Sequence, residues 1–93
     1  MNIALVGGGK AAVSILEHFM AFREHRITGV ADIKTDAPGI IRARELGVET
    51  TNDMETLVKR GDVELVIEVT GSGKVQEILR GILRPDQHMV TAT

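Results

Sequence analysis

The chain has 93 residues, a net charge of −2 and no cysteine, so we expect one domain without disulfides or thiolate metal sites. Its content of 43% hydrophobic and 26% charged residues is typical of a folded globular domain. The lysines and arginines form no basic run and no apolar stretch could span a membrane, so neither nucleic acid nor membrane is an expected partner, and the cytoplasm is the expected compartment.

The first half of the chain alternates twice between a strand pattern and a helix pattern. The apolar run at residues 2–6 ends in three glycines and predicts a strand that is buried on both faces. Apolar residues then recur at helical spacing over residues 11–22, and residues 27–33 predict a second strand. A second helix is expected from Asp36, with Pro38 in its first turn and Gly47 at its end.

The second half repeats this alternation. Residues 48–50 predict a short strand, and residues 54–60 predict a helix that Asn52 or Asp53 caps and Gly61 ends. Residues 65–69 predict the next strand, residues 75–83 an amphipathic helix, and residues 88–92 a last strand. Strict alternation with short connections predicts an α/β fold, a doubly wound five-stranded parallel sheet of order 3-2-1-4-5 with flanking helices.

The glycine-rich connection after the first strand carries the most informative motif. Gly7, Gly9 and Ala12 fit the pattern Gly-x-Gly-x-x-Ala, in which Gly7 allows a tight turn, Gly9 lets a pyrophosphate approach the backbone and Ala12 lets the helix pack closely. The helix that follows points free amides and a positive dipole end at the phosphates. A flexible strand-to-helix turn is the alternative, and Lys10 either pairs with the pyrophosphate or is simply exposed.

Asp32 ends the second predicted strand, about 20 residues after the glycines, where a carboxylate can accept hydrogen bonds from the adenosine ribose. Because a carboxylate repels a 2′-phosphate, we expect NAD rather than NADP, although Lys34 would soften that preference. The alternative for Asp32 is a solvated residue at a strand end.

The segment Thr70-Gly71-Ser72 follows the fourth predicted strand, so we expect it to face the ribose and nicotinamide side of the ligand. A plain loop that leads into a helix is the alternative reading of this segment. We expect Glu68, near the end of the same strand, to reach solvent, and we expect the three histidines to lie at the surface.

Four segments, at residues 3–9, 30–32, 65–71 and 88–92, together resemble the N-terminal domain of homoserine dehydrogenase. The wider aspartate dehydrogenase-like and glucose–fructose oxidoreductase-like group is similar too. The resemblance implies a nicotinamide cofactor in a Rossmann fold. The candidate cofactor-binding residues are Gly7, Gly8, Gly9, Lys10, Ala11, Ala12, Asp32, Ile33, Thr70, Gly71 and Ser72.

The first functional hypothesis is that residues 1–93 are the NAD(P)-binding domain of a longer oxidoreductase, since no residue matches the family's catalytic groups. The alternative is a nucleotide-sensing, non-enzymatic module of a signalling protein, and a weaker idea is a CoA-binding domain of related fold. The outer edge of the last strand also suggests self-association as a homodimer.

Overall fold

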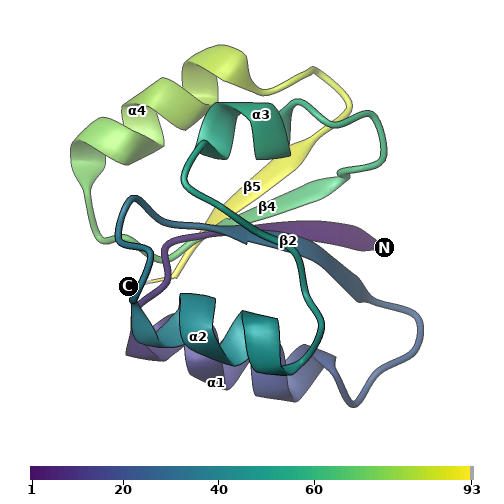
Figure 1. Cartoon of the computed structure of the whole chain (residues 1–93). Coiled ribbons are helices and arrows are strands. Elements are labelled where there is room, and N and C mark those ends of the chain that lie inside the picture. Colours follow the sequence, from purple (N-terminus) through teal and green to yellow (C-terminus); the bar gives the residue numbers. More distant parts are fainter. Residues whose placement is uncertain (93) are drawn as a thin grey trace.

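The computed structural model describes residues 1–92, which form a five-stranded parallel sheet between two layers of helices (Figure 1). The strands are β1 (Asn2–Val6), β2 (Arg26–Ala31), β3 (Thr50–Thr51), β4 (Leu65–Glu68) and β5 (His88–Thr91). The helices are α1 (Lys10–Phe19), α2 (Pro38–Glu45), α3 (Met54–Val58) and α4 (Gly73–Ile82). The sheet order β3-β2-β1-β4-β5 confirms the predicted doubly wound Rossmann topology. No helix within residues 1–92 is long and apolar enough to cross a membrane.

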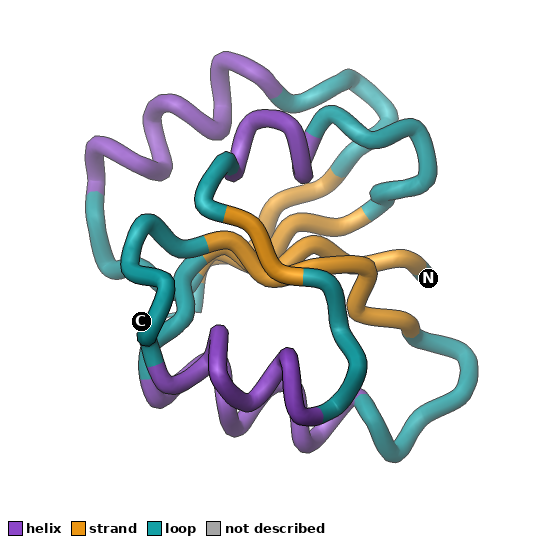
Figure 2. Tube along the Cα trace, in the orientation of Figure 1, coloured by secondary structure: helices purple, strands orange, loops and turns teal. Residues whose placement is uncertain are grey.

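The central strand β1 separates two apolar cores, which explains its unbroken hydrophobic sequence. Alternate side chains of a strand point to opposite faces, so Ile3 and Leu5 enter the core under α1 and α2. Ala4 and Val6 enter the core that α3 and α4 cover. Figure 2 shows the strands passing between these two helical layers. The carboxyl ends of β1, β2 and β4 therefore meet at one edge, where the glycine turn begins.

Several element boundaries differ from the predicted ones, mostly at helix ends. Helix α1 stops at Phe19 rather than residue 22, because tighter turns follow in which the amide of Phe22 donates to the Phe19 carbonyl. Helix α2 begins at Pro38 rather than Asp36, and Ala37 occupies its N-cap position without a side-chain hydrogen bond. Gly47, with φ of +76°, follows the end of this helix as predicted.

The elements after α2 also differ from their predicted bounds. Strand β3 starts at Thr50 rather than residue 48, because the amide of Val48 is still bonded to the carbonyl of Ala43 in the helix, at 2.8 Å. Helix α3 ends at Val58, and Asp53, not Asn52, caps it. Helix α4 begins at Gly73, two residues before its predicted start.

Candidate functional site

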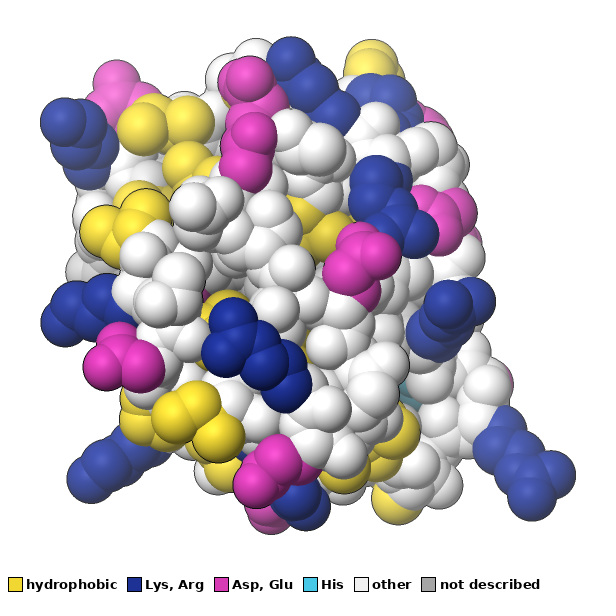
Figure 3. Space-filling view, in the orientation of Figure 1, with side chains coloured by type: hydrophobic (Ala, Val, Ile, Leu, Met, Phe, Trp, Pro, Cys, Tyr) yellow, Lys and Arg dark blue, Asp and Glu magenta, His cyan; other side chains and the backbone are white. Residues whose placement is uncertain are grey.

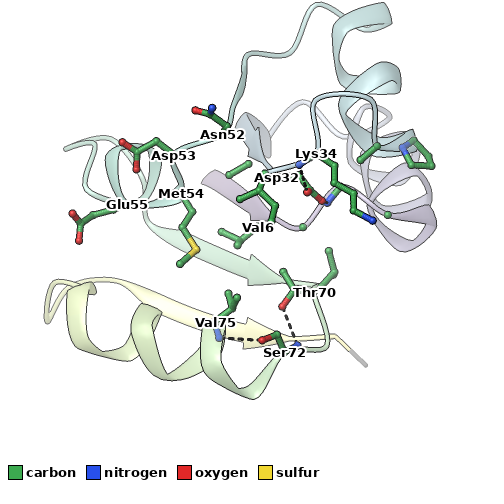
Figure 4. Close-up of a pocket in the computed structure, with 18 residues that line it drawn as sticks. Val6, Asp32, Lys34, Asn52, Asp53, Met54, Glu55, Thr70, Ser72 and Val75 are labelled. Carbon is green, nitrogen blue, oxygen red and sulfur yellow. Dashed lines mark hydrogen bonds between the residues drawn. The ribbon is translucent and has the colours of Figure 1, made fainter.

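A cleft of about 870 Å³ opens at the carboxyl ends of β1, β2 and β4 (Figure 4). The face of the molecule seen in Figure 3 carries intermingled basic and acidic side chains, without a large patch of one sign. The cleft is lined by Val6, Gly7, Gly8, Gly9, Ala31, Asp32, Ile33, Lys34, Ala37, Pro38, Asn52, Asp53, Met54, Glu55, Val69, Thr70, Ser72 and Val75. This is the edge at which doubly wound sheets bind ligands.

Gly7 makes the sharp turn between β1 and α1 and has to be a glycine for two reasons. Its φ of +113° lies in the region that L side chains rarely adopt. A Cβ atom there would also lie 3.0 Å from the Thr70 nitrogen and 3.0 Å from the Val69 carbonyl carbon. The first glycine of the motif therefore brings the ends of β1 and β4 into direct contact.

The three residues that follow Gly8 leave main-chain donors available at the start of α1. No acceptor within residues 1–92 takes the amides of Gly9, Lys10 and Ala11. A Cβ atom on Gly9 would have no atom within 4 Å, so the space in front of it is open. The first turn of a helix with free amides and no side-chain cap is a favourable place for an anion.

Gly8 behaves differently from Gly9. It is buried, and its amide donates to Oδ2 of Asp32 at 2.7 Å. Its carbonyl accepts a hydrogen bond from the amide of Gly39 at 2.6 Å, which ties the turn to the start of α2. The amide of Gly8 is therefore occupied by protein, and Gly8 positions Asp32 beside the turn.

Ala12 is fully buried in the core between the sheet, α1 and α2. The structure adds a constraint to the predicted close packing on the sheet, because a Cβ atom on Gly39 would lie 2.8 Å from the Cβ atom of Ala12. A small residue is thus needed at both positions for α1 and the start of α2 to approach each other.

Asp32 follows β2, is half-buried and turns its carboxylate towards the glycine turn (Figure 4). Oδ2 accepts from Gly8, and Oδ1 accepts from the amide of Lys34 at 2.8 Å. A carboxylate has about four acceptor positions, so two remain for hydroxyl groups in the cleft. Next to it, Ile33 is 84% exposed and forms an apolar part of the lining.

Glu68 is buried, and the expectation that it reaches solvent is wrong. Its Oε2 accepts hydrogen bonds from the Thr70 amide at 2.6 Å, the Gly71 amide at 3.1 Å and the Thr70 hydroxyl, while Oε1 accepts from Gln76 Nε2 at 2.9 Å. Burial by itself raises the pKa of Glu68, but these hydrogen bonds outweigh it and hold the pKa below its ordinary value. The segment after β4 folds back over the strand end and encloses the carboxylate.

The hydrogen bonds of the Thr70–Ser72 segment continue from Glu68 into the helix. The Thr70 hydroxyl accepts from the amide of Ser72 at 3.0 Å, and the Ser72 hydroxyl accepts from the amide of Val75 at 3.3 Å, which caps α4. Figure 4 shows both bonds on the side of the cleft where α4 begins. Thr70 and Ser72 line the cleft, whereas Gly71 does not.

Four further cleft residues, Asn52, Asp53, Met54 and Glu55, were absent from the predicted set. They form the start of α3, and Asp53 accepts from the hydroxyl and the amide of Thr56, the two bonds that lower the pKa of Asp53 most. The sequence held a signal for these residues, since they follow the carboxyl end of a predicted parallel strand. That end lies at the same edge of the sheet as the glycine turn.

Not every residue from the sequence prediction reaches the cleft lining or the surface. Lys10 and Ala11 are exposed at the start of α1 and do not line the cleft.

His18 and His88 are exposed, but His25 is half-buried, and its Nδ1 atom has no hydrogen-bond partner within residues 1–92. The prediction of surface histidines is therefore wrong for His25, because the ring packs edge-on against Phe19.

Known proteins are similar to this chain in sequence or in fold. Acetaldehyde dehydrogenase 1 from Salinispora arenicola is 32% identical over 78 residues, which are 78% of this chain and 25% of that protein. Three solved structures, each 20% identical, share the fold. The first is a Desulfitobacterium hafniense protein assigned as an NADPH-dependent oxidoreductase, with a TM-score of 0.80 over 98% of this chain and 26% of that protein. The second is homoserine dehydrogenase from S. aureus, with a TM-score of 0.79 over 100% of this chain and 26% of that protein. The third is scyllo-inositol dehydrogenase from Lactobacillus casei with bound NAD(H), with a TM-score of 0.76 over 98% of this chain and 27% of that protein.

The chain thus spans about a quarter of the length of the relatives that it matches. The family described as "Homoserine dehydrogenase, NAD binding domain" matches residues 7–93, which include the glycine turn, Asp32 and the segment after β4. The chain therefore belongs to the family of homoserine dehydrogenase NAD-binding domains.

Proposed function

We propose that this chain binds NAD in the cleft at the carboxyl ends of the strands and serves as the cofactor-binding part of an oxidoreductase. The observation that carries the proposal is the set of free amides of Gly9, Lys10 and Ala11 beside the open space at Gly9. A pyrophosphate needs such donors together with a close approach to the backbone. Membership of the NAD-binding family supports a nicotinamide dinucleotide as the ligand.

The charges that line the cleft favour NAD over NADP. Asp32, Asp53 and Glu55 contribute three carboxylates, whereas Lys34 contributes the one ammonium group among the lining residues of the described chain. Asp32 presents free acceptor positions that suit ribose hydroxyls. A 2′-phosphate would add negative charge to this acidic surface and would be repelled.

The bound nicotinamide would supply the hydride acceptor or donor, and this chain's residues would hold the dinucleotide in place. The amides at the start of α1 would bind the pyrophosphate, and Asp32 would orient the adenosine ribose. Thr70 and Ser72 would position the other half of the ligand. We propose that a further part of a longer protein binds the substrate, since the chain spans about a quarter of its relatives.

A matched pair of glycine substitutions tests the proposed site. Gly9→Val places a side chain in the open space of the cleft, and Gly61→Val places one in open space at the other end of the sheet, both without positive φ. Calorimetric titration with NAD⁺ should show binding by the natural chain and by Gly61→Val. Gly9→Val should stay folded and bind at least about tenfold more weakly, because the phosphates lose charge-assisted hydrogen bonds.

Unchanged affinity of the folded Gly9→Val variant would exclude the turn as the phosphate site. Absence of NAD⁺ binding by the natural chain would overturn the proposed function itself.

A further inference from the structure

Glu68 is a buried anion whose hydrogen-bond partners are all neutral. Its side chain is 0% exposed, and its donors are two main-chain amides, one hydroxyl and one side-chain amide. Within residues 1–92 no lysine, arginine or histidine forms an ion pair with it. The negative charge is therefore solvated by dipoles but not cancelled by a cation.

The carboxylate stays ionised because the groups that contact it donate hydrogen bonds to it. Both of its oxygens receive N–H or O–H groups, which favour the charged form. Glu68 also lies beside the start of α4, where Gln76 of the first two turns contacts it and the helix dipole favours negative charge. The lowered pKa of Glu68 agrees with a full negative charge at neutral pH.

The position of this charge relative to the cleft follows from the fold. Strands β2 and β4 lie on either side of β1, so Asp32 and Glu68 end up on opposite sides of the glycine turn. A dinucleotide lies across this switch point, with the adenosine ribose at the β2 carboxylate and the second nucleotide towards β4. Oε2 of Glu68 accepts a hydrogen bond from the Thr70 amide at 2.6 Å, and Thr70 and Ser72 line the cleft on that side.

Resting on the proposed function, we infer that the uncancelled charge of Glu68 makes this site favour the oxidised cofactor, NAD⁺, over NADH. The nicotinamide ring is positively charged in NAD⁺ and neutral in NADH, so a nearby anion stabilises only the oxidised form. The electrostatic effect on cofactor binding is substantial because the carboxylate is buried in the protein, where the effective dielectric constant is lower than in water. Glu68 is in this sense a specificity-determining residue that acts through space, with no direct contact to the ligand required.

The variant Glu68→Gln separates charge from shape. Its amide oxygen can still accept from Thr70 and Gly71, and the amide of Gln76 can turn its oxygen towards the new N–H group. We expect the preference for NAD⁺ over NADH, measured as the ratio of the two dissociation constants by calorimetry, to fall by about three- to tenfold. Most of the change should come from weaker NAD⁺ binding.

Two control variants isolate the position of the charge. Glu77→Gln removes a charge from the exposed side of α4 and should leave the ratio unchanged. Asp32→Asn removes the carboxylate on the adenosine side and should weaken both forms of the cofactor by similar factors. Gln76→Lys places an ammonium beside Oε1 of Glu68 and should lower the ratio as Glu68→Gln does, which decides the question if Glu68→Gln does not fold.

An unchanged ratio in the folded Glu68→Gln variant, or in Gln76→Lys, would overturn the inference while the proposed function stands. Failure of the natural chain to bind either form would instead remove the proposed function.

Discussion

Two carboxylates flank the glycine turn, and their surroundings differ sharply. Asp32 follows β2, is half-buried and accepts two main-chain hydrogen bonds, which leaves acceptor capacity towards the cleft. Glu68 ends β4, is fully buried and accepts three hydrogen bonds from the segment that follows it and a fourth from Gln76 of α4. The same chemical group at equivalent edges of the sheet is thus available to a ligand in one case and consumed by the protein in the other.

This difference separates binding from stability. A carboxylate with free acceptor positions contributes mainly to ligand recognition, because folding uses only part of its capacity. A buried carboxylate that satisfies several donors contributes mainly to folding, because its loss leaves those donors without partners. Substitution of Asp32 should therefore affect mainly ligand binding, and loss of the Glu68 hydrogen bonds should affect mainly stability.

The largest effect is expected for Glu68→Leu. This change leaves the amides of Thr70 and Gly71 and the side chain of Gln76 without their acceptor, so we expect a loss of about 2–4 kcal/mol in the free energy of unfolding. Urea denaturation followed by circular dichroism measures it. Glu77→Ala, on the exposed side of α4, should change stability by less than about 0.5 kcal/mol. Equal effects of the two changes would contradict the structural role of Glu68.

The second-largest effect is expected for Asp32, where the loss is mainly in ligand binding and not in stability. Asp32→Ala should weaken NAD⁺ binding by about 10- to 100-fold, because the ribose loses one or two hydrogen bonds to a charged acceptor. The free energy of unfolding should fall by only about 1 kcal/mol, since the Lys34 amide is exposed and can turn to water, and only the Gly8 amide, whose hydrogen bond to Asp32 is partly buried, loses a protein acceptor. The discrimination against NADP should also decrease.

Asp36→Ala, at an exposed position between β2 and α2, is the matched control and should bind NAD⁺ as the natural chain does. Calorimetry with both dinucleotides gives these values. Retained NAD⁺ affinity in Asp32→Ala would show that the β2 carboxylate has no part in ribose recognition.

A smaller effect is expected at Thr70, whose hydroxyl donates to Glu68 and accepts from Ser72. Thr70→Val keeps the shape of the side chain but removes both bonds, so stability should fall by about 1–2 kcal/mol. Thr70→Ser keeps the hydroxyl and should recover most of that loss. If both variants unfold at the same urea concentration, the hydroxyl does not contribute to the loop.

The smallest effect is a change in the pH dependence of stability. The hydrogen bonds to Glu68 hold its folded-state pKa below the ordinary value of 4.5, so its contribution is fully present above that pH. The contribution is lost as the pH falls from 4.5 through the folded-state pKa, where the folded carboxylate takes up a proton. Unfolding curves at a series of acidic pH values should therefore decline less steeply in Glu68→Gln. A parallel decline in both chains would contradict this assignment.

Much of the architecture was predictable because it depends on patterns within single elements. The alternation of apolar runs and helical periodicity predicted the strand order, which the sheet confirms. Gly7 was predicted at a tight turn and Gly47 at the end of a helix, and both adopt positive φ. The location of Asp32 at the end of β2 also followed from its distance along the chain to the glycines.

The environment of individual polar groups was not predictable in the same way. The pattern around Glu68 is that of any strand end, and its burial depends on a segment that folds back because Gly7 brings Thr70 against β1. The occupied amide of Gly8 likewise depends on where β2 delivers Asp32. The acidic start of α3 enters the cleft only because β3 lies beside β2 at the edge of the sheet.

Read alone, the amino-acid order determined which segments become strands and helices and where a phosphate-binding turn can form, because backbone preference and hydrophobic periodicity are local properties. Only the tertiary structure decided which carboxylate is free and which is enclosed, and which amides remain unpaired. Those outcomes depend on atoms from distant parts of the chain that come together, as the Gly8 amide and Asp32 do through a hydrogen bond and as Gly7 and Thr70 do by close approach.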